Sequence, residues 1–147
     1  MDEASDLFAV TDAEHRGGLG VIRQYRLLAE EAVMQLRTDR YTTPPYGLFG
    51  GNPGALSRNL LTSAGTDNSE LLPSKITRTV RRGDVIRHEQ AGGGGYGPAH
   101  ERDPARVLED VLDGKITPAY ARDGFGVVVR YGAVDAAATA ALRQQAS

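Results

Sequence analysis

The chain has 147 residues, a net charge of −2, no cysteine and no tryptophan. The missing cysteine excludes disulfide scaffolds, thiolate catalysis, cysteine-ligated zinc and iron–sulfur clusters. The slight negative charge disfavours general nucleic-acid binding, and no apolar run is long enough for a transmembrane helix. The N-terminus, MDEASDLFAV, is acidic and lacks the basic region of a signal peptide. We therefore expect a cytoplasmic protein that binds neither nucleic acid nor a membrane.

The first part of the chain predicts an acidic N-terminal leader over residues 1–15, followed by a single domain over residues 16–147. The leader has the pattern for one helical turn around Leu7, Phe8 and Val10. Residues 19–28 alternate in the manner of a strand with one solvent-facing side. Residues 32–37 are predicted to be its hairpin partner, although the same stretch also has helical propensity.

The middle of the chain combines a long loop with further strands. Three prolines between residues 41 and 54 exclude regular structure there, and long ordered loops are often functional. A short strand is predicted over residues 56–62, with a turn at 64–69. Residues 74–81 alternate cleanly, and a tight turn at 82–84 leads into a strand at 85–90. The spacing predicts that these last two strands form a hairpin.

The last third changes to helices. Asp103 and Pro104 are typical of a helix start, and Gly114 of its end. The apolar face of this helix is expected to consist of Val107, Leu108, Val111 and Leu112. A second short helix is predicted from Thr117-Pro118 to about Gly124, then a buried strand over residues 125–130, then an alanine-rich helix capped by Asp135. The fold class predicted is therefore α+β: an antiparallel β-rich body with glycine-rich loops, followed by short helices and one further strand near the C-terminus.

The 18 glycines are unevenly distributed and fall mainly in three clusters. The clusters are Gly17, Gly18 and Gly20; Gly47, Gly50, Gly51 and Gly54; and Gly92, Gly93, Gly94, Gly95 and Gly97. Their N–H groups could approach an anion, but Tyr96 and Gly97 stand where a Walker loop needs lysine and serine or threonine. A dinucleotide loop needs a helix at once, and the next cap is Asp103. We favour a close backbone crossing or a contact between subunits.

Several polar residues allow two interpretations. His15, His88 and His100 lack metal-ligand spacing, so no metal site is predicted. Four arginines, Arg78, Arg81, Arg82 and Arg87, could form a basic patch, but the acidic residues around them favour a solvated sheet face or a subunit interface. Arg40 could bind a carboxylate with two hydrogen bonds, or pair with Asp39 to hold its own loop. The sequence leaves that choice open.

No catalytic residue is predicted in this chain. The residues expected to form ligand-binding or interface loops are Arg40, Gly50, Gly51, Asn52, Gly54, Gly92, Gly93, Gly94, Gly95 and Tyr96.

An ordered series of short motifs carries a family resemblance. The series comprises Arg16-Gly-Gly-Leu-Gly-Val-Ile-Arg-Gln-Tyr25, Asp39-Arg40, Pro44-Pro-Tyr-Gly-Leu-Phe-Gly-Gly51, Pro53-Gly54, Leu72-Pro-Ser-Lys75, Arg82-Gly-Asp-Val-Ile86, Gly92-Gly-Gly-Gly-Tyr-Gly97, Glu101-Arg-Asp-Pro104, Asp110-Val, Gly114-Lys-Ile-Thr-Pro118, Tyr120-Ala and Gly126-Val-Val-Val129. In this order the motifs resemble the C-terminal part of hydantoinase B family proteins, over about residues 16–143. Pro98 departs from the family, which usually has aspartate after Gly-Tyr-Gly.

The family includes the B components of N-methylhydantoinases, half of the ATP-dependent oxoprolinases, and subunits of acetone and acetophenone carboxylases. The resemblance covers only the end of such proteins, which suggests a separately encoded small subunit. It implies a non-autonomous component of a biotin-independent, ATP-dependent carboxylase of the acetophenone type. Large hydantoinase A-like and B-like subunits would be its partners. ATP and a divalent metal would be bound by those partners, with no cofactor bound by this chain.

Two alternatives remain at this stage. The chain could belong to an ATP-dependent amidohydrolase that opens hydantoin or oxoproline rings. It could also be a free-standing ligand-binding module, with the loops at Gly50-Gly51 and Gly92–Gly95 forming its site.

Overall fold

The fold is taken from a computed structural model that describes residues 10–145. Where one domain was expected, the described chain divides into two compact units. Unit 1 contains residues 10–20, 45–55 and 92–145, and unit 2 contains residues 21–44 and 56–91. Antiparallel sheets, short helices and C-terminal strands confirm the predicted α+β class.

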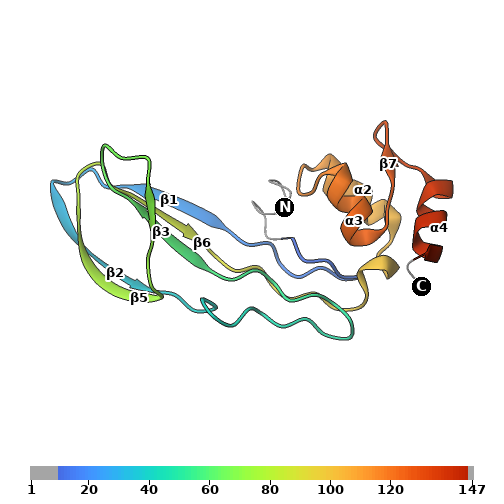
Figure 1. Cartoon of the computed structure of the whole chain (residues 1–147), viewed down its shortest axis with the longest axis horizontal. Helices are drawn as coiled ribbons and strands as arrows, with labels where there is room; N and C mark the ends of the chain where they lie inside the picture. The colour runs from blue at the N-terminus through green and yellow to red at the C-terminus, as the bar shows by residue number, and fades with distance from the viewer. Residues whose placement is uncertain (1–9, 146–147) are drawn as a thin grey trace. The chain divides into compact units, whose positions relative to one another are not determined.

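Unit 2 is a small β-sandwich (Figure 1). Its six strands are β1 (Ile22–Arg26), β2 (Glu31–Arg37), β3 (Arg58–Thr62), β4 (Ser69–Leu71), β5 (Lys75–Arg81) and β6 (Val85–Glu89). One sheet has the strand order β1-β6-β3-β4 and the other pairs β2 with β5, all antiparallel. The apolar core between them is formed by Leu61, Leu72 and Val80, with Met34 and Ile86 packed against it. The predicted alternation over β5 is confirmed, because Ile76, Arg78 and Val80 are its more buried residues.

The two predicted hairpins are wrong. β1 pairs with β6 rather than with β2, and β5 pairs with β2 rather than with β6. The connections β1–β2 and β5–β6 instead carry the chain from one sheet to the other. The predictions failed because alternation of apolar and polar residues identifies a strand but not its partner. β1 also lacks the expected buried side: only Ile22 is partly covered, because β1 is an edge strand.

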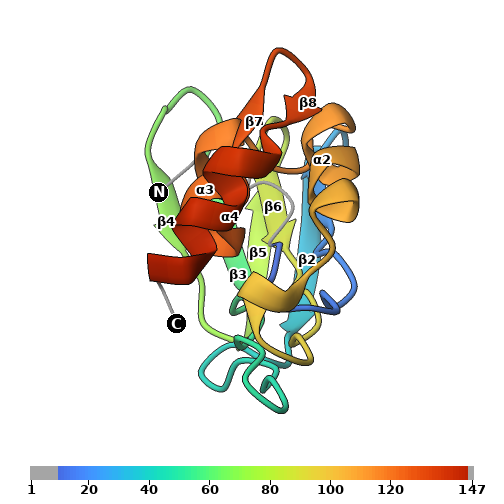
Figure 2. The ribbon, with the colours of Figure 1, turned by 90° about the vertical axis from the view of Figure 1, so that its right-hand side faces the viewer.

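Unit 1 contains the helices, which Figure 2 shows gathered beside the β7–β8 hairpin. Its elements are the short 3₁₀ helix η1 (Ala99–Glu101), α2 (Pro104–Leu112), α3 (Pro118–Phe125), β7 (Val129–Arg130), β8 (Ala133–Val134) and α4 (Ala136–Gln145). The predicted caps are confirmed: the side chains of Asp103, Thr117 and Asp135 each accept a hydrogen bond from a backbone N–H of the first helical turn. The core of unit 1 is formed by Val10, Val107, Ile116, Ala121, Phe125 and Val127.

Three details of unit 1 differ from expectation. Phe125 ends α3 instead of beginning a strand, and the strand is limited to Val129–Arg130, paired with a second strand that was not predicted. Leu112 is exposed, whereas Asp110 lies on the buried face of α2. The third detail concerns the leader: residues 10–15 are built into unit 1, with Val10 and Ala13 buried. The leader's predicted helical turn at Leu7 and Phe8 lies outside the described residues.

Within residues 10–145, every helix is too short or too polar to cross a membrane.

The turn after β5 gives a pH-dependent prediction. Asp84 is buried, and its carboxylate accepts hydrogen bonds from the backbone N–H groups of Arg81 (2.8 Å) and Ala64 (2.9 Å), which lower its pKa below 3.8. A lowered folded pKa means that this carboxylate stabilises the fold above pH 3.8, and that the contribution is lost as the pH falls through the folded pKa. Asp84→Asn should therefore reduce the free energy of unfolding at pH 7 by about 1–3 kcal/mol.

Denaturant unfolding at a series of pH values checks this expectation. The gap between wild type and Asp84→Asn should narrow as the pH falls below 3.8. Asp67→Asn, in the exposed loop before β4, is the matched control and should change little. A gap that stays constant with pH would contradict the role assigned to the Asp84 carboxylate.

Candidate functional site

The three glycine clusters meet in unit 1 as three backbone segments lying side by side. The segments are residues 13–18, 45–54 and 92–97, and we call this arrangement the glycine crossing. Tyr96 forms an antiparallel bridge with His15 and a parallel bridge with Leu48. The His15 and Tyr96 N–H groups each donate to the other's C=O at 2.9 Å, and the Gly95 N–H donates to the Asn52 C=O at 3.0 Å. The segment 92–97 is therefore the middle strand of the crossing.

Close approach explains several of the glycines of the crossing. A Cβ atom at Gly17 would lie less than 3.0 Å from the backbone of Gly93, and one at Gly51 would meet the backbone of Gly95. A Cβ at Gly94 would collide with the carbonyl of Tyr46. Backbone atoms cannot move aside as a flexible side chain can. The structure thus supports the interpretation of the tetraglycine as a backbone crossing.

Several N–H groups of this loop donate to backbone carbonyls within the chain. Gly93 donates to the Gly18 C=O (2.8 Å), Gly95 to the Asn52 C=O, and Gly97 to the Leu48 C=O (3.0 Å). These donors are not free to surround a phosphate, unlike those of an anion-binding loop. The crossing is a packed structure, and any ligand would meet its side chains instead.

An exposed aromatic group lies on the crossing. The Gly51 N–H donates to the Leu48 C=O at 3.0 Å, with positive φ at Phe49 (49°) and Gly50 (90°), which is a type I′ turn. A left-handed conformation at a bulky residue is strained. Phe49 is nevertheless 75% exposed and packs on Tyr96, with ring centroids 5.1 Å apart. Phe49 therefore presents its ring beside a second exposed aromatic ring.

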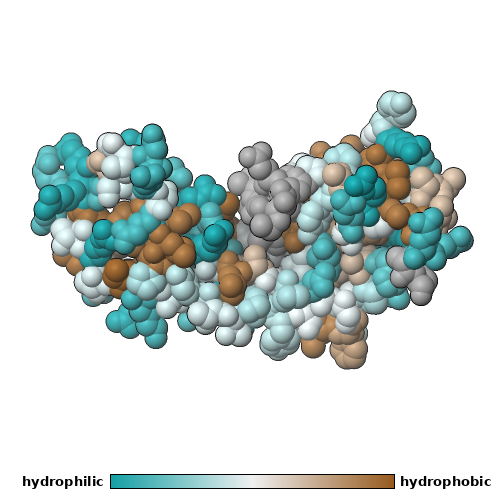
Figure 3. Space-filling view, in the orientation of Figure 1, coloured by the Kyte–Doolittle hydropathy of each residue, from teal (hydrophilic) through white to brown (hydrophobic). Residues whose placement is uncertain are grey.

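Further apolar side chains continue this surface. Tyr46, Leu48 and Tyr96 are exposed as well, and His15 lies 6.1 Å from the Tyr96 ring, centroid to centroid. We call the set His15, Tyr46, Leu48, Phe49 and Tyr96 the aromatic patch. Figure 3 shows apolar surface at the tip of the 45–54 loop. A group of exposed aromatic and apolar side chains on one loop region is a feature of interaction sites.

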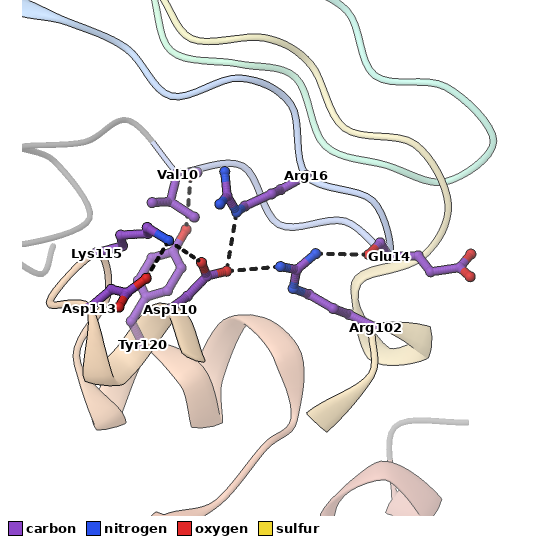
Figure 4. A network of polar contacts seen from close by, with 8 residues as sticks. All are labelled: Val10, Glu14, Arg16, Arg102, Asp110, Asp113, Lys115 and Tyr120. Atoms are coloured by element: carbon purple, nitrogen blue, oxygen red, sulfur yellow. Dashed lines mark hydrogen bonds and ion pairs between the residues drawn. The ribbon is translucent and has the colours of Figure 1, made fainter. Parts of the chain in front are cut away.

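A buried ionic network holds the first segment of the crossing (Figure 4). The Asp110 side chain, 4% exposed, accepts hydrogen bonds from Arg102 (2.9 Å), Arg16 (3.2 Å) and Lys115 (3.2 Å). Arg102 also donates to the Glu14 C=O at 3.0 Å. Because Glu14 and Arg16 belong to the first segment, one carboxylate on α2 fixes the position of this segment.

Two pKa shifts belong to the surroundings of the crossing. Hydrogen bonds to Asp113 and Asp110 raise the pKa of Lys115, so its positive charge is strongly favoured. Burial raises the pKa of the Asp12 carboxyl, and hydrogen bonds to Tyr120 and Asn52 partly oppose that rise. The Asp12 C=O also accepts a hydrogen bond from the Asn52 N–H at 3.1 Å. Asn52, one of the predicted loop residues, is therefore engaged with Asp12.

The structure brings nine of the ten predicted loop residues together in the crossing and places the tenth, Arg40, in unit 2. Arg40 has a φ of 58° and, among residues 10–145, no ion pair with Asp39. It lines an open, polar hollow of about 460 Å³ with Thr38, Thr43 and Ser74. Whether any of the ten contacts a ligand or a partner stays a prediction.

The arginines of the suspected basic patch are each paired with a glutamate. The pairs are Arg78–Glu70, Arg81–Glu31, Arg82–Glu30 and Arg87–Glu89. In the described part of the chain, no three histidine, aspartate or glutamate side chains gather as metal ligands.

Sequence reasoning missed the Asp110 network. The available signal was an acidic residue three positions after Val107, on the face of α2 that turned out to be buried.

The comparisons with known proteins agree with this architecture. Residues 12–99 match the family described as Hydantoinase B/oxoprolinase. This chain belongs to that family. Its relatives include the B component of a D-/L-hydantoinase from Pseudomonas sp. (strain NS671), 35% identical over 115 residues, which cover 78% of this chain and 19% of that protein. Another is the acetone carboxylase alpha subunit of Xanthobacter autotrophicus, 39% identical over 67 residues, covering 42% of this chain and 9% of the relative.

Solved structures show the same fold. A nucleotide-free acetone carboxylase aligns over 96% of this chain and 24% of its own, with a TM-score of 0.78 and 22% identity. The ATP-dependent caprolactamase of Pseudomonas jessenii aligns over 93% and 25%, with a TM-score of 0.70 and 24% identity. The hydantoinase B/oxoprolinase chain described here spans no more than about a fifth of the length of the curated relatives it matches.

The glycine crossing predicts a contrast between two neighbouring glycines. Gly17→Ala should lower the free energy of unfolding by about 1–3 kcal/mol, because its Cβ meets the Gly93 backbone. Gly18→Ala should leave stability unchanged or slightly raised, since nothing lies within 4 Å of a Cβ there. Denaturant unfolding of both variants tests the crossing, and equal stabilities would count against it.

The ionic network predicts a large effect at Asp110. Asp110→Asn leaves three cations around a neutral amide, and we expect a loss of about 3–5 kcal/mol in the free energy of unfolding. Asp123→Asn removes an exposed ion pair with Arg122 and serves as the control, with little expected change. Thermal unfolding measures both, and a small effect at Asp110 would show that the network does not hold unit 1 together.

Proposed function

We propose that this chain is a non-autonomous small subunit of a biotin-independent, ATP-dependent carboxylase of the acetophenone type. In this proposal it completes a large hydantoinase B-like subunit in a cytoplasmic assembly. Hydantoinase A-like partners bind ATP and a divalent metal and activate bicarbonate as carboxyphosphate. The chain itself binds no cofactor and contributes surface rather than chemistry.

The observation that carries the proposal is the aromatic patch on the glycine crossing. Three members of the patch, Tyr46, Phe49 and Tyr96, are exposed aromatic residues, and the rings of Phe49 and Tyr96 lie 5.1 Å apart, centroid to centroid. Exposed aromatic residues are typical anchors of protein interfaces. Family membership supports the kind of partner, because relatives of this chain are named as subunits of a hydantoinase and of a carboxylase.

A second function has its own support. The match to the hydantoinase B component is longer than the match to the carboxylase alpha subunit, 115 residues against 67. A complex containing this chain could therefore hydrolyse a hydantoin or oxoproline ring with ATP. Bicarbonate-dependent ATP turnover by the reconstituted complex would support carboxylation, whereas turnover that needs only the cyclic amide would support hydrolysis.

Substitution of Phe49 tests the interface. Phe49→Asn should change the free energy of unfolding of the isolated chain little. Asparagine tolerates the positive φ better, which stabilises the fold by about 1 kcal/mol, and the lost ring contact with Tyr96 destabilises it by about the same amount. Binding to co-expressed hydantoinase A-like and B-like subunits should weaken at least tenfold, as for a buried interface anchor. Gel filtration and titration of the purified partners measure both quantities.

Tyr131→Asn is the matched control. Tyr131 is also exposed, has a φ of 50° and precedes a glycine in the two-residue turn between β7 and β8. Its substitution should leave partner binding unchanged. A wild-type chain that stays monomeric beside the large subunits would contradict the proposed function.

A further inference from the structure

The sandwich of unit 2 is covered on one side and open on the other. Leu61, Ile86 and Tyr25 stand directly opposite one another across β3, β6 and β1, so their side chains share the inner face of the larger sheet. Leu61 is 2% exposed, whereas Tyr25 is 56% exposed. The next inward-facing residues along these strands show the same difference in exposure. Asn59 on β3 is buried, and Arg23, in line with it on β1, is exposed. The inner face is therefore uncovered at β1.

The position of the smaller sheet explains the open flank. Arg78 on β5 forms an ion pair of 2.6 Å with Glu70 on β4, and β4 is the edge of the larger sheet opposite to β1. β5 therefore lies on the β4 side, and β2 lies toward β1. The free edge of β2 is consequently the edge that borders the open flank.

The backbone of β2 presents unused hydrogen-bonding groups at this edge. The Thr38 N–H donates to the Ser74 C=O (2.8 Å), and the Glu30 C=O accepts from the Arg82 N–H (3.0 Å). Since the direction of these groups alternates along a strand, the even-numbered residues between 30 and 38 face β5. The backbone N–H and C=O groups of the odd-numbered residues point to the free edge. These residues are Glu31, Val33, Gln35 and Arg37. An exposed edge of this length is a template for another strand.

Two cationic side chains at the C-terminal end of β2 lack carboxylate partners. Arg37 and Lys75 stand directly opposite each other on the outer face of the β2–β5 ladder, and like charges in such a pair repel. Neither has an ion pair within residues 10–145. Glu31, at the other end of β2, is paired with Arg81, so the unpaired charges of this strand pair are positive.

We propose that the free edge of β2 binds an extended polypeptide segment of a partner, by strand addition, and that this segment alternates apolar and acidic side chains. The added strand continues the two-stranded sheet over the open flank. Its apolar side chains face inward and cover Tyr25, while its carboxylates face outward beside Arg37 and Lys75. The inference uses unit 2 alone and does not depend on the proposed function.

The test uses the full 147-residue chain and a fluorescent nine-residue peptide in which valine and glutamate alternate. Val33→Pro removes an N–H that points to the free edge of β2 and leaves the β2–β5 ladder intact. Thr79→Pro is its matched control: Thr79 stands directly opposite Val33, and its N–H points to the other edge of the same sheet. Fluorescence anisotropy should show at least tenfold weaker peptide binding for Val33→Pro and less than a twofold change for Thr79→Pro.

Charge reversal gives a second measurement should the proline variants fail to fold. A second peptide has lysine in place of each glutamate. Arg37→Glu should reverse the preference of the chain for the glutamate peptide over the lysine peptide. Lys75→Glu should change this preference less, because Lys75 is one strand farther from the added strand. Three results would overturn the proposal. The first is equal affinity for a control peptide of the same composition in which the valines form one block and the glutamates another. The second is an equal loss of peptide affinity in Val33→Pro and Thr79→Pro. The third is displacement of the peptide by an oligonucleotide of equal charge to the same extent from the wild type and from Val33→Pro.

Discussion

Three backbone segments pass so close together in unit 1 that no side chain fits between them, and much of the described site follows from this. A Cβ at Gly17, Gly51 or Gly94 would overlap the backbone of a neighbouring segment. Because the segments touch, their N–H and C=O groups bond to one another, and the middle strand brings Tyr96 beside His15 and Leu48. Because N–H groups of residues 92–97 bond to neighbouring carbonyls, they are not available to bind an anion. The exposed side chains of the crossing form its surface instead.

The ionic network and the crossing are two parts of one arrangement. Asp110 is buried on α2, where a lone carboxylate would be costly, and three cations from separate parts of unit 1 compensate it. Two of the residues that it organises, Glu14 and Arg16, lie within the first glycine segment. The helices thereby position a loop surface, as expected for an interaction site that is carried on loops and held by a rigid scaffold.

Unit 2 presents a different problem, because a four-stranded sheet faces a two-stranded one. The core is complete around Leu61 and Val80 and ends before Tyr25. Where a sheet stops short, backbone groups and charges are left for another strand to satisfy. The aromatic patch of unit 1 and the open flank of unit 2 are thus two separate surfaces that suit a protein whose relatives are named as subunits of larger enzymes.

The sequence by itself determined the local elements. Caps at Asp103, Thr117 and Asp135 and the alternation of β5 act over a few residues, so their structural role could be understood without the fold. The ordered motifs also identified the family. Only the tertiary structure decided which strand pairs with which, since alternation in β1 and β2 is compatible with several partners. It also decided that Asp110 is buried among Arg16, Arg102 and Lys115, and that Arg40 lies in a different unit from the glycines. These features depend on contacts between residues far apart in the chain, and no local pattern specifies such contacts.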